Sequence, residues 1–119
     1  MAAQDSRLSI QEDGDMITAR FLDTNILDEA SIQQLGDEIV GIVERSSNLK
    51  LLLVFDNVEH LSSAALGMLI TVNNKVRQRG GQLRLSEIES QLLEVFTITK
   101  LDQLFQIYDR AQEAVDSFK

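Results

Sequence analysis

A short, almost wholly apolar run in the middle of the chain constrains the fold more than any other feature. Residues 49–55 read Leu-Lys-Leu-Leu-Leu-Val-Phe and are followed by Asp56 and Asn57, two residues that favour turns. A short apolar run without alternation is typical of a strand that is buried on both of its faces. The run therefore predicts the central strand of a sheet, followed by a loop.

The segment after this loop has the spacing of one helical face. The positions that define this face, and the two glycines that end it, are Ala65, Leu66, Leu69, Ile70, Asn73, Val76, Gly80 and Gly81. The pattern predicts a helix from about Ser63 to Arg79, which is about 25 Å long at 1.5 Å per residue. Its first turn has unpaired N–H groups and the positive end of the helix dipole, so we expect Ser62 to cap it and Ser63 to be its first residue.

The rest of the chain alternates between strand and helix patterns. We expect a hairpin over residues 8–21 with acids that suit an edge, a helix ending near residues 46–48, a strand over 82–86, a short helix near 92–96, a strand over 105–108 and an amphipathic end over 111–118. The order β-β-α-β-α-β-α-β-α predicts an α/β fold, with a mixed sheet of four to five strands and helices mostly on one face. Residues 1–119 are expected to form a single domain.

Composition excludes several classes of protein. The chain has 119 residues, 44% of them hydrophobic, and no cysteine, so disulfides and thiolate metal sites are excluded. The first residues lack the apolar core of a signal peptide, and no apolar run approaches the ~20 residues of a membrane span. We therefore expect a cytoplasmic protein that does not bind membranes.

The net charge of −8 is unevenly distributed along the sequence. Residues 1–60 hold 12 acids and 4 bases, whereas residues 61–119 hold seven of each. Residues 60–86 contain no acid and include Lys75, Arg77, Arg79 and Arg84. These bases suit the negative end of the helix and a solvated face, and they also suggest the hypothesis of an acidic patch on a partner. The acidic half and the few aromatic residues argue against nucleic acid binding.

Residues for catalysis are lacking. His60 is the only histidine, so neither a nucleophile–base pair nor a histidine-rich metal site can form, and a loop histidine is the simpler interpretation. Asp56 and Glu59 could flank the start of the helix as a carboxylate pair, but they are more typical of turn residues. The six glycines form no nucleotide-binding motif. We expect a protein without enzymatic activity, cofactor or metal.

Three segments in the expected order resemble the STAS domain of bacterial anti-sigma factor antagonists. Residues 62–67, Ser-Ser-Ala-Ala-Leu-Gly, are similar to the Asp-Ser-Ser/Thr-Gly-Leu-Gly turn at the start of that family's helix. Residues 79–85 resemble its Gly-Gly before a strand, and residues 93–108 resemble its helix, leucine turn and final strand. The resemblance spans nearly the whole chain and implies the STAS fold.

The chain departs from the family's motif at the position that matters most for regulation. Aligned through Leu66 and Gly67, the motif Asp falls on Ser62 and the phosphorylated Ser or Thr falls on Ala64, which has no oxygen to modify. Ser63 is the nearest hydroxyl, but one residue on a helix turns a side chain by about 100°. Ser63, and after it Ser62, are therefore the phosphorylation candidates.

The resemblance implies an anti-sigma factor antagonist in partner switching, which binds an anti-sigma factor or serine kinase protein and is released by phosphorylation. The partner-binding residues that it implies are His60, Leu61, Ser62, Ser63, Ala64, Ala65 and Met68. The alternative, favoured by Ala64, is a docking or ligand-binding STAS module that is not phosphorylated. The sequence leaves the oligomeric state open.

Overall fold

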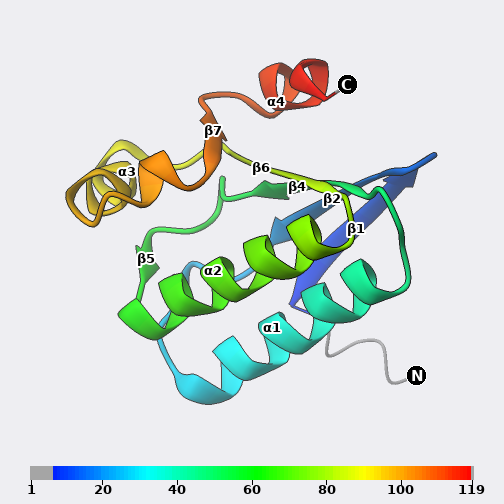
Figure 1. Cartoon of the computed structure of the whole chain (residues 1–119). Coiled ribbons are helices and arrows are strands. Elements are labelled where there is room, and N and C mark those ends of the chain that lie inside the picture. Colours follow the sequence, from blue (N-terminus) through cyan, green and yellow to red (C-terminus); the bar gives the residue numbers. More distant parts are fainter. Residues whose placement is uncertain (1–6, 119) are drawn as a thin grey trace.

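A five-stranded mixed sheet forms the centre of the protein. The computed structural model describes residues 7–118, and its strands lie in the order β1-β2-β4-β6-β7 (Figure 1). Their bounds are β1 Leu8–Asp13, β2 Met16–Phe21, β4 Lys50–Val54, β6 Gln82–Ser86 and β7 Gln106–Tyr108. β1 is antiparallel to β2, and all other neighbours in the sheet are parallel. The hairpin β1–β2 thus places β1 at an edge, as the sequence predicts.

Helices cover both faces of this sheet unequally. The helices are α1 Glu29–Glu44, α2 Ser63–Gln78, α3 Ser90–Ile98 and α4 Ala111–Ser117, with a 3-10 helix, η2, at Leu101–Gln103. α1 and α2 run side by side along one face, and α4 lies alone on the other (Figure 1). The prediction of an α/β fold with a mixed sheet and helices mostly on one face is confirmed.

β4 is buried on both faces, which confirms the interpretation of the apolar run. Leu51, Leu53 and Phe55 belong to the main core beneath α1 and α2, whereas Leu52 and Val54 pack with Ala114 of α4. Successive side chains of a strand point to opposite faces, so apolar residues are needed on both faces of β4 from Leu51 onward.

The two glycines that end α2 have different structural roles. Gly80 has a φ of +75°, a left-handed conformation that glycine adopts without a steric penalty. Gly81 lies so close to Leu49 that a Cβ would stand 2.7 Å from the Leu49 carbonyl oxygen. The pair therefore ends the helix and lets the chain turn directly into β6.

Two short elements were not predicted. β3, Asn25–Ile26, and β5, His60–Leu61, form a separate two-stranded parallel sheet beside the start of α2 (Figure 1). Two residues are too few to show any periodicity, so the sequence gives no signal for them. The last strand begins at Gln106, one residue later than predicted, because the Phe105 amide donates to the Leu101 carbonyl at 3.0 Å in the preceding turn. None of the helices in residues 7–118 is long and apolar enough to cross a membrane.

Candidate functional site

The loop between β4 and α2 is held in place by the segment that leads into α1. The Asn57 side chain donates to the Phe21 carbonyl at 3.2 Å, and the Glu59 amide donates to the Thr24 carbonyl at 2.8 Å. The pairing of β3 with β5 continues this attachment as far as Ile26 and Leu61. Two segments that lie far apart in sequence thus meet at the start of α2. We call residues 60–68 the α2 mouth.

Ser62 caps α2, as the sequence predicts. Its backbone is extended, with φ −81° and ψ 167°, and its Oγ accepts a hydrogen bond from the Ala65 amide at 3.2 Å. The Ser62 amide in turn donates to the Ile26 carbonyl at 3.1 Å. Ser63 is the first residue of the helix. Because the Ser62 hydroxyl is already engaged, the two serines are not equivalent.

The candidate partner-binding residues differ in exposure. Ser63 and Ala64 are exposed in the first turn, and His60 is exposed just before it. Leu61, Ser62 and Met68 are half-buried. One expectation needs correction: Ala65 has no exposed surface because it faces the core, so its side chain does not lie on the surface that a partner would contact.

A groove between α1 and α2 extends from the α2 mouth. It encloses about 340 Å³, and its walls include Ile32, Gly36, Val40, Met68 and Val72. The helices approach closely here, because a Cβ at Gly36 would lie 3.2 Å from the Met68 side chain. Met68 therefore belongs both to the α2 mouth and to an apolar groove beside it.

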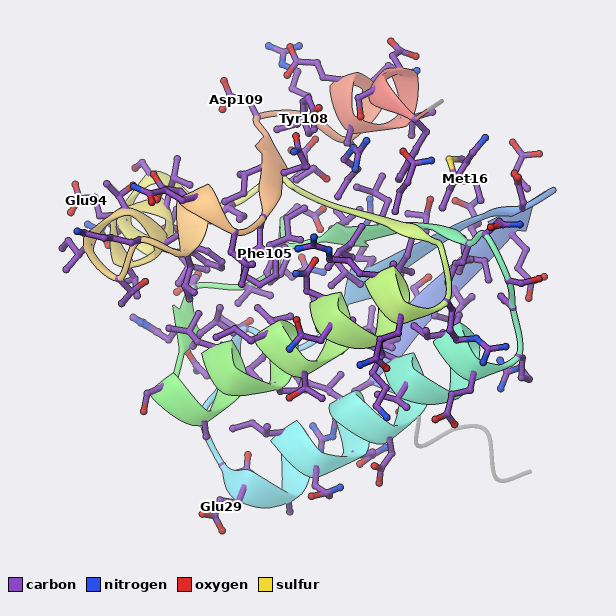
Figure 2. The ribbon with its side chains drawn as sticks, in the orientation of Figure 1. Met16, Glu29, Glu94, Phe105, Tyr108 and Asp109 are labelled. Carbon is purple, nitrogen blue, oxygen red and sulfur yellow. The ribbon has the colours of Figure 1, made fainter. Side chains whose placement is uncertain are left out.

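Acidic residues are frequent in the two segments that lead to the start of α2 and of α1. The neighbouring segments, residues 21–31 and 56–61, hold five carboxylates and no lysine or arginine, namely Asp23, Asp28, Glu29, Asp56 and Glu59. Two of them are paired, Asp23 with Arg7 at 2.9 Å and Asp56 with Arg20 at 3.2 Å. Glu29 extends outward at the start of α1 (Figure 2).

The basic residues of α2 lie at its other end. Lys75 stands 4.0 Å from Glu44, and the Arg79 Nε donates to the Ser46 carbonyl at 2.9 Å. These contacts complement the ends of α1 and α2, which agrees with the structural interpretation of the bases. Lys75 and Arg79 lie away from the α2 mouth. The hypothesis of a partner with an acidic patch therefore applies to the end of α2 and not to the mouth.

Asp28 shows the electrostatic character of this end of the molecule. It caps α1, and its carboxylate accepts from the Ser31 amide at 3.0 Å. The hydrogen bond from the Ser31 backbone holds the pKa of Asp28 below its ordinary value. An ionised cap on α1 thus lies at the same end as the neutral Ser62 cap on α2 (Figure 1).

Sequence patterns gave no indication of Leu27, which lies beside the mouth. It follows Ile26, the residue whose carbonyl binds Ser62, and is 53% exposed. Its position depends on the β3–β5 pairing, which is too short to predict. Across residues 7–118, no group of three or more histidine, cysteine or acidic side chains could hold a metal ion.

Comparison with known proteins identifies the family. A profile of the STAS domain matches residues 10–114. The anti-sigma-B factor antagonist of Bacillus subtilis is 26% identical over 89 residues, which cover 75% of this chain and 80% of that protein. A homolog of TM1081 from Thermotoga neapolitana is 34% identical over 67 residues, which are 56% of this chain but only 59% of that protein.

A solved structure agrees in fold. The STAS domain protein of Planctomyces limnophilus superposes with a TM-score of 0.83 at 17% identity, over 92% of this chain and 96% of that one. The fold, the order of the elements and the profile match lead to one conclusion. The chain belongs to the STAS domain family, among relatives named as anti-sigma factor antagonists.

Proposed function

We propose that this protein is an anti-sigma factor antagonist that binds an anti-sigma factor or serine kinase protein through the α2 mouth. The observation that carries the proposal is the exposure of Ser63 and Ala64 in the first turn of α2, in a chain of the STAS domain family. The apolar Leu61, Met68 and Leu27 lie around this turn and supply surface that a partner can desolvate.

The acids around the mouth define the kind of partner surface. Glu29 and Glu59 form no ion pair with another residue of 7–118, and such carboxylates favour lysines and arginines at the rim of the interface. The first turn itself carries only small side chains, so a partner can approach its backbone closely. A charge added there would stand in the desolvated centre of the complex, where it has no counter-ion and where its burial is costly.

Phosphorylation, where it occurs, falls on Ser63 in this proposal. Its hydroxyl makes no hydrogen bond to another described residue, whereas the Ser62 hydroxyl is engaged by Ala65. A phosphate adds about 1.5 to 2 negative charges, next to a segment, residues 56–61, that already carries the carboxylates of Asp56 and Glu59. The exposed Ala64 has room for a hydroxyl, so Ala64→Ser should give a better kinase substrate than the native chain.

The first experiment identifies the partner and measures the complex. The full chain is used as bait in a lysate of its own cells, the captured protein is identified by mass spectrometry, and its affinity is measured with purified components. Ser63→Glu should weaken this complex at least about tenfold, because a charge in a desolvated interface costs more than ~1.4 kcal/mol. Ser47→Glu is the matched control, since Ser47 is an exposed serine beyond the end of α1.

A kinase assay separates the two forms of the proposal. The captured kinase and ATP are incubated with the native chain, with Ser63→Ala and with Ala64→Ser, followed by intact mass measurement. Phosphate on Ser63 would support a regulated antagonist. Binding unaffected by Ser63→Glu, with no phosphate on Ser62 or Ser63, would refute it and leave the alternative, a docking module that is not phosphorylated, for which Ala64 is the supporting observation.

A further inference from the structure

The outer edge of the main sheet carries a hollow that the proposed function does not use. Within residues 7–118, β1 pairs only with β2, so its other side is an open edge of the sheet (Figure 1). A hollow of about 250 Å³ lies between this strand and the flank of α1 that is turned away from α2. Its lining residues are Ile10, Asp37, Glu38, Gly41, Ile42 and Arg45. We call the open side of β1, together with this hollow, the β1 edge.

The backbone of β1 has hydrogen-bonding groups on this open side. The Leu22 amide donates to the Arg7 carbonyl at 3.1 Å, so the odd-numbered residues of the strand turn their backbone groups towards β2. Backbone groups of successive residues point to opposite sides of a strand, so the N–H and C=O groups of Ile10 and Glu12 point outwards. An edge of this kind is a template for a strand of another chain.

Ile10 adds exposed apolar surface at the middle of the edge. Its side chain is 39% exposed, and it lines the hollow together with Gly41 and Ile42 of α1. At the start of β1, the Arg7 Nε donates to Gln34 Oε1 of α1 at 3.2 Å. The strand and the helix therefore run in the same direction, and Ile10 stands level with Gly41. A second strand beside β1 would cover Ile10 and remove its apolar surface from water.

Two opposite charges lie on either side of the centre of the hollow. Asp37 and Arg45 stand four positions before and after Gly41, which is about 6 Å each along the helix axis. The Arg45 side chain makes no ion pair or hydrogen bond within residues 7–118, and its Nη1 lies 3.6 Å from where a Cβ of Gly41 would stand. Asp37 is exposed and accepts a hydrogen bond from the Gln33 side chain at 3.0 Å. The two charges thus belong to one surface but do not pair within the chain.

A two-fold axis that passes beside Ile10 and Gly41 exchanges these charges between two copies. Around such an axis, the two β1 strands run antiparallel with Ile10 opposite Ile10, and the two α1 helices also run antiparallel. Asp37 of each copy then lies level with Arg45 of the other copy. The hollow is therefore complementary to a second hollow of the same kind, as an interface between identical chains requires.

We propose that the β1 edge binds a second copy of this chain and forms a two-fold dimer with one continuous sheet. The two Ile10 residues exchange backbone hydrogen bonds at the axis, and two Asp37–Arg45 ion pairs flank them. The acids of β1 do not oppose this pairing. Each Glu12 stands two positions from the axis, so the two lie about 14 Å apart along the strands, beyond the Debye length of ~8 Å. The dimer does not use the α2 mouth and does not depend on the proposed antagonist function.

The first test is sedimentation equilibrium of the full chain. Between about 5 and 500 µM, the chain should show a monomer–dimer equilibrium with a Kd below ~100 µM. Asp37→Arg and Arg45→Asp should each weaken the dimer at least about tenfold, because each places two pairs of like charges across the axis. The double variant should restore the Kd to within about threefold of the native value, since both ion pairs form again with their charges exchanged. Glu113→Arg is the matched control, because Glu113 is an exposed acid of α4 on the other face of the sheet.

The second test is cysteine crosslinking, which reports the register of the two strands. The native chain has no cysteine, so a single introduced thiol can react only with its copy in another molecule. Ile10→Cys should form disulfide-linked dimers under mild oxidation, because the Cα atoms of directly opposed residues are about 5.5 Å apart, within the range of a disulfide. Glu12→Cys should not, since its two copies lie about 14 Å apart along the strands.

Four results would overturn the proposal. One is a chain that remains monomeric at about 500 µM, and another is an equal effect of Asp37→Arg and Glu113→Arg on the Kd. The third is a double variant that dimerises no better than the two single variants, because the ion pairs would then not be reciprocal. The fourth is crosslinking of Glu12→Cys as fast as that of Ile10→Cys, which would refute the register. None of these outcomes depends on whether the protein binds an anti-sigma factor.

Discussion

Replacement of Ser62 by alanine tests the geometry of the α2 mouth directly. The variant removes the Oγ that accepts the Ala65 amide at 3.2 Å, and it leaves that N–H group with only water as a partner. Loss of a serine cap costs typically ~1 kcal/mol, within a range of about 0.5–2. A urea m-value of about 2 kcal/mol per molar is usual for a small protein, so the unfolding midpoint should fall by roughly 0.5 M.

Two further variants make this prediction specific. Ser63→Ala is the matched control, because the neighbouring serine accepts no capping bond, and its midpoint should stay close to that of the native chain. Ser62→Asp should also be nearly neutral, since aspartate caps equally well. Its favourable interaction with the helix dipole, ~0.3–1 kcal/mol, is opposed by the carboxylates of Asp28 and Glu59 nearby.

The assay is urea unfolding followed by circular dichroism, with the same m-value required of all variants. Equal losses of stability in Ser62→Ala and Ser62→Asp would refute the role of Ser62 as a cap. So would equal losses in Ser62→Ala and Ser63→Ala, because the two serines would then be equivalent. In either case Ser62 would no longer be distinguished from Ser63, and the reason for choosing Ser63 as the phosphorylation candidate would be lost.

Two other predictions concern the core and the other capped helix. Leu69 lies on the buried side of α2 and is 1% exposed, so Leu69→Ala should lower the free energy of unfolding by roughly 2–5 kcal/mol. Ile98 is 78% exposed, so Ile98→Ala should lower it by less than about 0.5 kcal/mol. Similar losses for the two variants in urea unfolding would contradict the assigned burial. The hydrogen bond from the Ser31 backbone lowers the pKa of Asp28 below its ordinary value of 3.8. The ionised Asp28 therefore stabilises the folded protein fully above pH 3.8, and this stabilisation is lost as the pH falls through the lowered pKa. Asp28→Asn, which caps without titrating, should therefore unfold with a smaller loss of stability between pH 5 and pH 2, and an unchanged acid transition would rule this contribution out.

The sequence alone was sufficient to predict the architecture, because each main element has its own local signal. The unbroken apolar residues 51–55 require a strand covered on both faces, and β4 is such a strand. The spacing of Leu66, Leu69 and Val76 defines the buried side of α2, and the glycine pair defines its end. Ser62 could be recognised as a cap because capping depends on residues only three positions apart.

The features that matter for recognition depended on tertiary structure. The sequence places His60 to Ser86 in one acid-free segment, but α2 separates its serines from its basic residues by most of the length of the helix. Three of the five carboxylates, Asp23, Asp28 and Glu29, come from another part of the chain, between β2 and the start of α1. Charge along a sequence therefore did not predict charge on a surface.

The same holds for the exposure of single residues. Ala64 and Ala65 are adjacent alanines, yet Ala64 is exposed and Ala65 is buried. The reason is that successive side chains on a helix differ in direction by about 100°. Local patterns specify which elements form, whereas packing between distant segments decides which side chains meet, and binding depends on the latter.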